Sequence, residues 1–175
     1  LGVPLNVCGA YVIGDDLEKV KELYNKGIEN NVSGLEVLNR EELLKRIPNI
    51  TDKITCGLYA KNSAIVSPYL LTICLTEEGI INGGTVELNY NTVKVEYCDN
   101  LYKITNGEVE YVARYVINSA GNNYNDVANL LGSENYDITF KRGEYYILDR
   151  SEYGLVNATI FPLPSAHSKG ILVTP

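Results

Sequence analysis

Strand-like segments crowd into the middle of the chain, and this crowding is the strongest constraint on the fold. Between residues 85 and 117, four stretches rich in β-branched and aromatic residues follow one another with only short connections. One connection contains Asn106-Gly107, the residue pair preferred in tight two-residue hairpin turns. Strands joined by short turns pair antiparallel. We therefore expect residues 85–117 to form a small antiparallel meander.

Helices are predicted on both sides of the meander. Asp16 can cap a helix that runs to residue 28 with one apolar face. Ser67-Pro68 marks the start of a second helix, which we expect to reach residue 81 and to point its leucines inward. A third helix should follow Gly121 and end at Gly132. Helices that alternate with strands, next to a meander, favour a mixed α/β (α+β) fold with a large antiparallel component.

The last third of the chain is rich in tyrosine and isoleucine and predicts further strands. Residues 138–148 and 155–163 indicate two long strands, and a short one is expected at 170–174. We expect residues 140–163 to join a larger sheet with the first strand of the chain, at residues 7–14.

Composition and charge exclude several classes of function. With 45% hydrophobic residues in 175, the chain has enough apolar residues for a folded core, so disorder is not expected. Its net charge of −7 repels phosphate backbones, so we expect no nucleic-acid partner. Neither a signal peptide nor an apolar run of membrane-spanning length is present, which predicts a cytoplasmic protein. An anionic substrate would need a few cations gathered in one pocket.

The cysteines and the single histidine do not form a metal-binding pattern. Cys8, Cys56, Cys74 and Cys98 lie far apart without a CxxC pair, so we expect no metal site and reduced thiols. His167 could serve as a general base. Its neighbours are proline, serine and lysine, which favour an exposed loop histidine instead.

Residues 116–121 could lie against a cofactor. Ser119, Ala120 and Gly121 occupy an expected turn from a buried strand to a helix. Small side chains let a phosphate or a sugar approach the backbone, and the N-terminus of a helix favours anions. Tight packing of the strand against the helix would require the same small residues, so the pattern by itself leaves both explanations open.

Arg142 lies near the start of an aromatic and apolar strand-like stretch, residues 140–149. An arginine in this position could hold a carboxylate or a phosphate through two hydrogen bonds, with a hydroxyl from Tyr145 or Tyr146. A structural ion pair with Glu144 explains the same arginine at least as well.

Several stretches, taken in order, resemble one family of enzymes. They are similar to the FAD-dependent oxidoreductases of the D-amino-acid-oxidase superfamily, in the branch of the glycerol-3-phosphate dehydrogenases and L-2-hydroxyglutarate oxidases. The stretches are residues 8–14, 34–38, 41–43, 48–49, 64–72, 116–121, 142–146, 148–149, 160–164 and 169–175. The Gly-x-Gly-x-x-Gly motif that holds the FAD pyrophosphate in this family is not among them. We therefore expect an internal piece of a two-lobed flavoenzyme, inactive and binding FAD weakly or not at all by itself.

The resemblance implies a place for each part of the chain and a cofactor site. Residues 1–65 and 133–175 would belong to the substrate-binding lobe with its antiparallel sheet, and residues 66–132 to the FAD-binding domain with its small meander. In the family pattern, the backbone at Val93 would meet the adenine. Ser119, Ala120 and Gly121 would lie near the phosphates and ribose of FAD.

The resemblance also implies a substrate site and a reaction. Arg142, Gly143 and Tyr146 match a strand of the substrate lobe, where Arg142 would hold the anion of the substrate. The implied reaction is oxidation of glycerol 3-phosphate or of a 2-hydroxy acid such as L-2-hydroxyglutarate, by hydride transfer to flavin. The resemblance does not choose between these substrates, between dehydrogenase and oxidase, or among electron acceptors. The catalytic base of the family lies in segments that this chain lacks, so no catalytic residue is assigned.

A self-contained α/β binding domain without a cofactor is the alternative from another class. Such a domain should be closed, with no large exposed apolar face, whereas a fragment of a larger enzyme should expose the surface that the rest of the enzyme covers.

Overall fold

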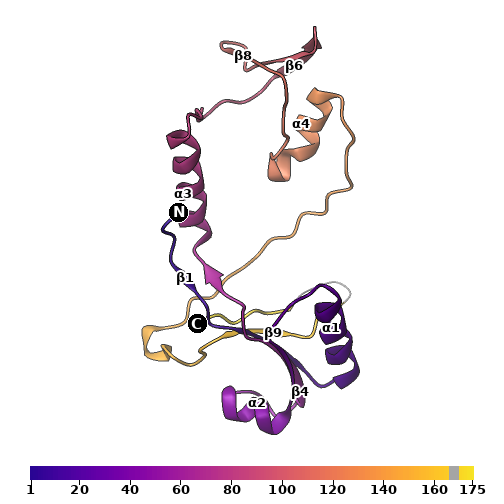
Figure 1. Cartoon of the computed structure of the whole chain (residues 1–175), viewed down its shortest axis with the longest axis vertical. Coiled ribbons are helices and arrows are strands. Elements are labelled where there is room, and N and C mark those ends of the chain that lie inside the picture. The colour runs from indigo at the N-terminus through magenta and orange to yellow at the C-terminus, as the bar shows by residue number, and fades with distance from the viewer. Residues whose placement is uncertain (166–169) are drawn as a thin grey trace. The chain divides into compact units, whose positions relative to one another are not determined.

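The computed structural model describes residues 1–165 and 170–175 and divides the chain into two compact units (Figure 1). Unit 1 comprises Leu1–Gly83 and Ile147–Pro175, and unit 2 comprises Gly84–Tyr146. The chain thus leaves unit 1, forms unit 2 and returns to unit 1. Helices and strands are mixed along the chain, so the mixed α/β class is confirmed.

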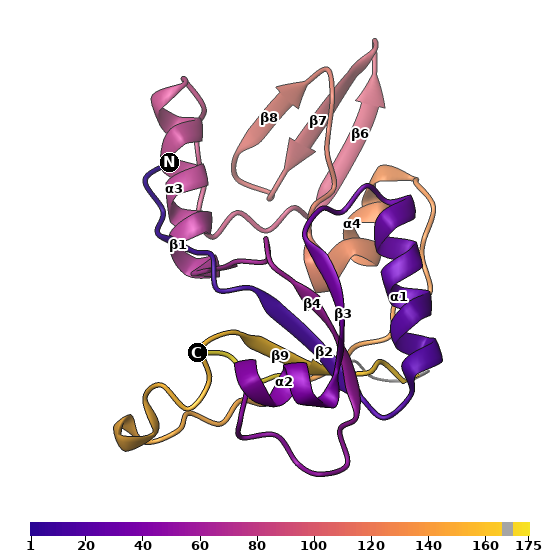
Figure 2. The ribbon, with the colours of Figure 1, turned by 60° about the horizontal axis from the view of Figure 1, so that its bottom comes forward.

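Unit 1 is built on a four-stranded sheet with the strand order β3-β4-β2-β9 (Figure 2). β2 (Ala10–Gly14) pairs antiparallel with β4 (Cys56–Ala60), and β4 pairs antiparallel with β3 (Leu35–Asn39). β9 (Thr159–Pro162) runs parallel to β2. Parallel neighbours cannot be joined by a tight turn. The connection between β2 and β9 therefore contains most of the chain, including unit 2.

Two helices cover opposite faces of this sheet: α1 (Leu17–Glu29) and α2 (Arg40–Arg46) (Figure 2). Successive side chains of a strand point to opposite faces. In β2, Val12 packs with the residues under α1, whereas Tyr11 and Ile13 pack with the residues under α2. One short strand therefore contributes to both cores of unit 1.

Polar side chains at the helix ends explain where these two helices begin. The carboxylate of Asp16 accepts hydrogen bonds from the backbone N–H groups of Glu18 and Lys19, each 3.1 Å long. Asn39 and Glu42 form a capping box, in which each side chain accepts a hydrogen bond from the backbone N–H of the other residue. The helix predicted after Asp16 is confirmed.

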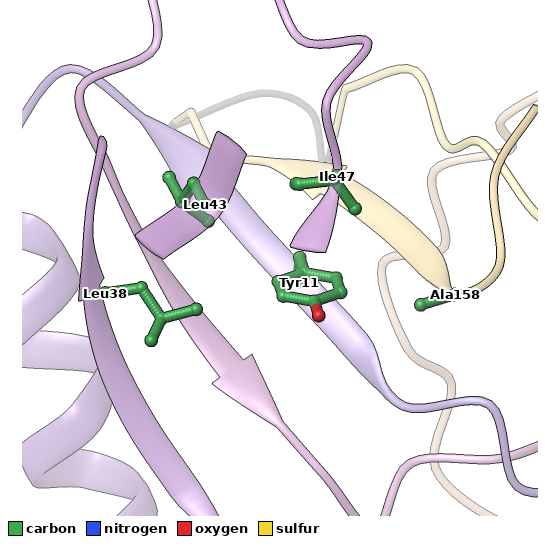
Figure 3. Close-up of a cluster of buried hydrophobic side chains, with 5 residues drawn as sticks. All are labelled: Tyr11, Leu38, Leu43, Ile47 and Ala158. Carbon is green, nitrogen blue, oxygen red and sulfur yellow. The ribbon is translucent and has the colours of Figure 1, made fainter. Parts of the chain in front are cut away.

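Five buried residues form the core under α2 (Figure 3). They are Tyr11, Leu38, Leu43, Ile47 and Ala158. Leu43 is completely buried. The cluster draws on β2, β3, α2 and the residue before β9, so it joins segments from both ends of the chain. Burying apolar surface contributes roughly 25 cal/mol per Å², and this cluster is therefore expected to hold α2 and β9 on the sheet.

Smaller elements complete unit 1. β1 (Leu5–Asn6) and β5 (Ile65–Val66) pair antiparallel in a two-stranded ribbon that leads into the next helix. The single-turn helix η2 (Arg150–Glu152) lies between the return from unit 2 and β9.

α3 (Pro68–Ile81) has the predicted bounds, but none of its side chains is buried. Ser67 caps the helix by accepting a hydrogen bond from the N–H of Leu70 at 3.4 Å. Apolar residues of the helix itself lie on all of its sides, and Tyr69 and Ile81 are 81% and 78% exposed. The prediction that its leucines point inward is wrong, because the described part of the chain does not cover them. A helix that is apolar all round is typical of a buried position.

Unit 2 contains the predicted meander. β6 (Lys94–Cys98), β7 (Leu101–Thr105) and β8 (Glu110–Ala113) pair antiparallel in sequence order, which confirms it (Figure 2). Gly107 has a φ of 97°, in the left-handed region that glycine adopts readily. The connection between β7 and β8 comprises residues 106–109, so the predicted two-residue turn is two residues too short.

Two parts of the strand-rich middle do not form strands. Residues 85–88 and 115–117 pair with no strand of the described chain. Tyr115 and Ile117 are exposed. The prediction of a buried strand before Asn118 is therefore wrong, because no neighbouring strand satisfies its backbone groups or covers its side chains.

One α-helix follows in unit 2, as the sequence predicts. α4 (Tyr124–Leu131) begins after the single turn η1 (Gly121–Asn123). It ends at Gly132, whose φ of 65° forms the expected left-handed cap. α4 lies against β6.

The predicted strands of the last third are mostly absent from the described structure. Residues 138–148 take no regular structure, and Tyr145, Tyr146 and Ile147 are 90%, 91% and 97% exposed. A strand is stable only beside a partner, and this stretch has none among the described residues. The prediction for 155–163 is confirmed only for β9, which makes the sheet mixed and not antiparallel.

The end of the described chain forms a single bridge instead of the strand predicted at 170–174. Val173 pairs with Ile160 of β9 through two backbone hydrogen bonds, of 2.8 and 3.1 Å. Within residues 1–165 and 170–175, no helix has both the length and the hydropathy needed to cross a bilayer.

Candidate cofactor and substrate sites

The small residues predicted to contact a cofactor form the loop between β8 and α4. Ser119 and Gly121 are exposed, and Ala120 is half-buried. Gly121 has a φ of 57°, and a Cβ added there would meet no atom within 4 Å. The side chain of Asn118 holds the loop through two hydrogen bonds. Its Oδ1 accepts from the N–H of Ala120 at 3.2 Å, and its Nδ2 donates to the Tyr124 carbonyl at 2.9 Å.

This loop fits what a bound FAD would require of the chain. The space beside Gly121 is open, so a phosphate could approach the backbone closely. The loop leads into the N-terminal end of α4, where the helix dipole places about half a positive charge. Asn123 does not cap α4 with its side chain. Asp126 lies in the first turn and offsets part of the positive end, so backbone N–H groups are the main attraction for an anion here.

Val93, predicted to meet the adenine, lies directly before β6 in the same unit as the loop. Its backbone N–H donates to the Thr105 carbonyl at 2.9 Å, and its side chain is exposed. The N–H is therefore committed to the meander. An adenine contact at Val93 would use its carbonyl oxygen or its side chain.

The three residues predicted to bind substrate lie in the irregular stretch of unit 2. Arg142 has a side chain that is 89% exposed, and its Nε lies 3.8 Å from a carboxylate oxygen of Glu144. Gly143 and Tyr146 are exposed as well. The strand expected around Arg142 is absent, while the alternative pairing with Glu144 is present in a loose form. An exposed ion pair of this length contributes little, so the role of Arg142 in substrate binding stays a prediction.

Among the described residues, no histidine or cysteine contributes to this site. His167, considered as a general base, lies outside the described residues. The four cysteines are free, and Cys56 is the one that is buried. In the part of the chain that the structure describes, no three His, Cys, Asp or Glu side chains gather as they would around a metal ion.

One polar cluster was not predicted from the sequence. Tyr11 of β2 and Tyr59 of β4 stack with ring centroids 4.6 Å apart, and the guanidinium of Arg46 lies 5.1 Å from the Tyr59 centroid. Arg46 also pairs with Glu36 at 2.7 Å, and its hydrogen bond to Glu36 raises the pKa of the guanidinium. Burial raises the pKa of Tyr11. The alternation of side chains along the strands could have predicted that Tyr11 and Tyr59 lie on the same face of the sheet. It could not have predicted that Arg46 lies over the Tyr59 ring.

This cluster does not fit an anion, because Glu36 already neutralises Arg46. A shallow groove in unit 1, between α1 and β3, is equally unsuited. Its one cation, Lys21, pairs with Glu18 at 2.8 Å, and Glu42 adds a carboxylate. The open loop in unit 2 therefore stays the candidate cofactor site.

The family model described as "FAD dependent oxidoreductase" (DAO) matches residues 1–175, and the chain therefore belongs to this family. The resemblance inferred from the sequence is confirmed, and the cofactor of the family is FAD.

Two relatives and one solved structure show which enzymes of this family the chain is similar to. The chain is 36% identical to a glycerol 3-phosphate dehydrogenase of Caloramator mitchellensis, over all of this chain and 37% of that protein. It is 26% identical to an L-2-hydroxyglutarate dehydrogenase of Indibacter alkaliphilus, over 93% of this chain and 41% of that protein. Among solved structures, it resembles the L-α-glycerophosphate oxidase of Mycoplasma pneumoniae with FAD bound. That match has a TM-score of 0.81 and 23% identity, and covers 99% of this chain and 48% of that one.

The chain thus spans less than half the length of these relatives. The assignment of residues 1–65 and 133–175 to a substrate-binding lobe, and of residues 66–132 to an FAD-binding domain, stays a prediction. The two compact units are divided at residues 83–84 and 146–147.

Proposed function

We propose that the chain is the middle part of an FAD-dependent enzyme that oxidises a small anionic substrate, with glycerol 3-phosphate as our first choice. The observation that carries this proposal is the family match over the whole chain, together with an open loop before α4 where the family pattern expects the cofactor. We also propose a cytoplasmic location, which the four free cysteines support.

The cofactor site would consist of the loop and the meander of unit 2. Ser119 and Gly121 would present backbone N–H groups to the phosphates, with Ala120 between them and its own N–H held by Asn118. The carbonyl of Val93 would accept a hydrogen bond from the adenine. When bound, FAD supplies the acceptor for the hydride that leaves the substrate carbon.

The substrate's anion would be held by Arg142, with Gly143 and Tyr146 beside it. Arg142 would have to leave Glu144, and this costs little because the pair is exposed and loose, at 3.8 Å. In a pocket closed to water, the planar guanidinium could then hold a phosphate or a carboxylate through two hydrogen bonds.

Glycerol 3-phosphate is the preferred substrate because a relative named for it has 36% identity, against 26% for one named for L-2-hydroxyglutarate. A 2-hydroxy acid is the second choice, since its carboxylate would make the same bidentate contact with arginine. Whether oxygen or another acceptor takes the electrons is open to direct measurement.

The exposed helix α3 favours this proposal over a self-contained domain without a cofactor. A closed domain would bury a helix that is apolar all round, yet α3 has no buried side chain. We accordingly propose that residues 1–175 alone are inactive and bind FAD weakly or not at all.

The test uses the product of the complete reading frame that contains these residues. We expect it to purify with bound flavin, and we expect anaerobic addition of glycerol 3-phosphate to remove the absorbance of oxidised flavin. Bleaching by L-2-hydroxyglutarate alone would identify the second substrate, and oxygen uptake would separate an oxidase from a dehydrogenase. A product that neither retains nor binds FAD would overturn the proposal.

The isolated 175-residue chain provides the matching control. Titration with FAD, followed by flavin fluorescence, should show weak binding or none. Stoichiometric binding at submicromolar FAD would instead mean that the chain carries a complete cofactor site.

A further inference from the structure

The amide group of Asn118 is hydrogen-bonded at both ends, and this links the proposed cofactor loop to the helix that follows it. Its oxygen accepts from the Ala120 N–H at 3.2 Å, two residues along the loop. Its nitrogen donates to the carbonyl of Tyr124, the first residue of α4, at 2.9 Å. The side chain is half-buried, so these bonds are partly sheltered from competition by water.

The two bonds restrain the backbone between residues 118 and 124. The bond to Ala120 closes a turn, and the bond to Tyr124 fixes that turn over the start of α4. Tyr124 is itself anchored, because its ring packs against that of Tyr136 with centroids 5.3 Å apart. Ser119 and Gly121 lie inside the restrained segment, and both are exposed.

We infer that Asn118 is a positioning residue for FAD, holding residues 119–121 in the conformation that the cofactor meets. This inference rests on the proposed function of the loop. The side chain contributes through the backbone it restrains, with no contact to the cofactor required. An amide suits the position because it is neutral and offers both a donor and an acceptor. A carboxylate at Asn118 would face the Tyr124 carbonyl without a proton to donate and would repel a pyrophosphate.

The expected effect follows from the order that Asn118 provides before the cofactor binds. Without the Asn118 side chain, the loop becomes ordered only when FAD binds. The entropy lost by fixing one residue then reduces the affinity for FAD by about tenfold. We therefore expect Asn118→Ala to weaken FAD binding by roughly 10- to 100-fold. Asn118→Ser should recover part of the loss, since a serine hydroxyl can accept from the N–H two residues on but cannot reach Tyr124.

Asn125, the second residue of α4, offers a matched control. Its Nδ2 donates to the Tyr136 carbonyl at 2.8 Å, and its Oδ1 accepts from the Tyr136 N–H at 3.0 Å. Asn125→Ala thus also removes two hydrogen bonds between an asparagine side chain and the backbone, but it keeps both hydrogen bonds of Asn118. The two alanine variants should lose similar stability, whereas only Asn118→Ala should lose FAD affinity.

The experiment compares wild type, Asn118→Ala, Asn118→Ser and Asn125→Ala in the full-length protein. FAD dissociation constants are measured by reconstitution of the apoprotein, and thermal melts of the apoproteins record stability. Weak binding by Asn118→Ala, partial recovery by Asn118→Ser and wild-type affinity for Asn125→Ala would support the inference. Equal FAD affinity in both alanine variants would overturn it. If wild type itself binds no FAD, the proposed function fails first, and the inference falls with it.

Discussion

Tyr11 and Tyr59 face each other directly across the antiparallel pair β2–β4, and their rings stack at an interplanar angle of 26°. The stack lies between the core under α2 and the guanidinium of Arg46, so it joins apolar packing to a charged surface group. Gly9 leaves room for it, since a Cβ at that position would lie 2.8 Å from a carbon of the Tyr59 ring.

Replacing Tyr59 by leucine should destabilise unit 1 by about 1–2 kcal/mol. The substitution removes both an aromatic pair and a cation–π contact, each worth about 0.5–1.5 kcal/mol. Urea unfolding followed by circular dichroism would measure the loss. Tyr153→Leu is the control, because Tyr153 is fully exposed to solvent and should be nearly neutral. Equal midpoints for the two variants would contradict a stabilising role for the stack.

Leu43→Ala should be among the most destabilising changes in unit 1. Leu43 is completely buried against the sheet, and truncating such a leucine costs about 2–5 kcal/mol. Leu44→Ala tests the assignment, because the neighbouring leucine is exposed and should lose less than about 1 kcal/mol. Denaturant midpoints with unchanged slopes would give both values. A larger loss for Leu44 would mean that α2 packs on its other face.

The start of α1 should weaken in acid because of Asp16. The hydrogen bond from the backbone N–H of Lys19, followed by that from the Lys19 side chain, lowers the pKa of this carboxyl below its ordinary value of 3.8. A lowered folded-state pKa means that the stabilisation is present above the unfolded value and disappears as pH falls through the folded one. Asp16→Asn should remove this pH dependence. The stability difference between wild type and Asp16→Asn should therefore change below about pH 4.

The helices and caps were predictable because the residues that determine them are adjacent in the sequence. Ser67-Pro68 and Gly132 specify the start of α3 and the end of α4 within one turn of the chain, and both predictions are confirmed. Strands depend on partners far away. The stretch around Arg142 has the composition of a strand but no neighbouring strand in the described chain, so composition alone gave the wrong structure.

The role of the candidate site stays a prediction, and the sequence predicts only part of its local structure. Gly121 is identifiable from its sequence context, and its positive φ agrees with a close backbone approach. The contribution of Asn118 depends on two hydrogen bonds, one of which reaches Tyr124 across a change from turn to helix. No spacing rule specifies that bond. The cluster around Arg46 likewise requires the register of β2 against β4.

Gly121→Ala should reduce FAD affinity by more than its effect on stability explains. Alanine at a φ of 57° costs about 1–2 kcal/mol of stability, and its methyl group would occupy the open space proposed for the cofactor. Gly132→Ala is a close control, with a φ of 65° and the same open surroundings at the other end of α4. FAD titrations and thermal melts of both variants in the full-length protein test this prediction. If FAD affinity is equal, the cofactor does not approach Gly121.

Arg142→Ala should lower kcat/KM for the anionic substrate by about 30- to 1000-fold, corresponding to about 2–4 kcal/mol for a charge-assisted contact. Arg142→Lys should recover only part, because an ammonium cannot reproduce the planar fork. Glu144→Gln removes the observed pairing partner and should leave kcat/KM near wild type. Unchanged kinetics in Arg142→Ala, with a lowered melting temperature, would limit Arg142 to a structural ion pair.

The parallel pairing of β9 with β2 has a consequence for the time course of synthesis. All three strands of the meander and α4 lie within residues 84–146, so a ribosome that has released residue 146 has delivered everything these elements need to pair. The pairing of β2 with β9 forms later, because Thr159–Pro162 is translated almost 150 residues after Ala10. Since chains emerge from the N-terminal end, unit 2 can fold while one edge of the sheet in unit 1 is still open. A chaperone that protects nascent edge strands would therefore have its longest opportunity at Ala10–Gly14.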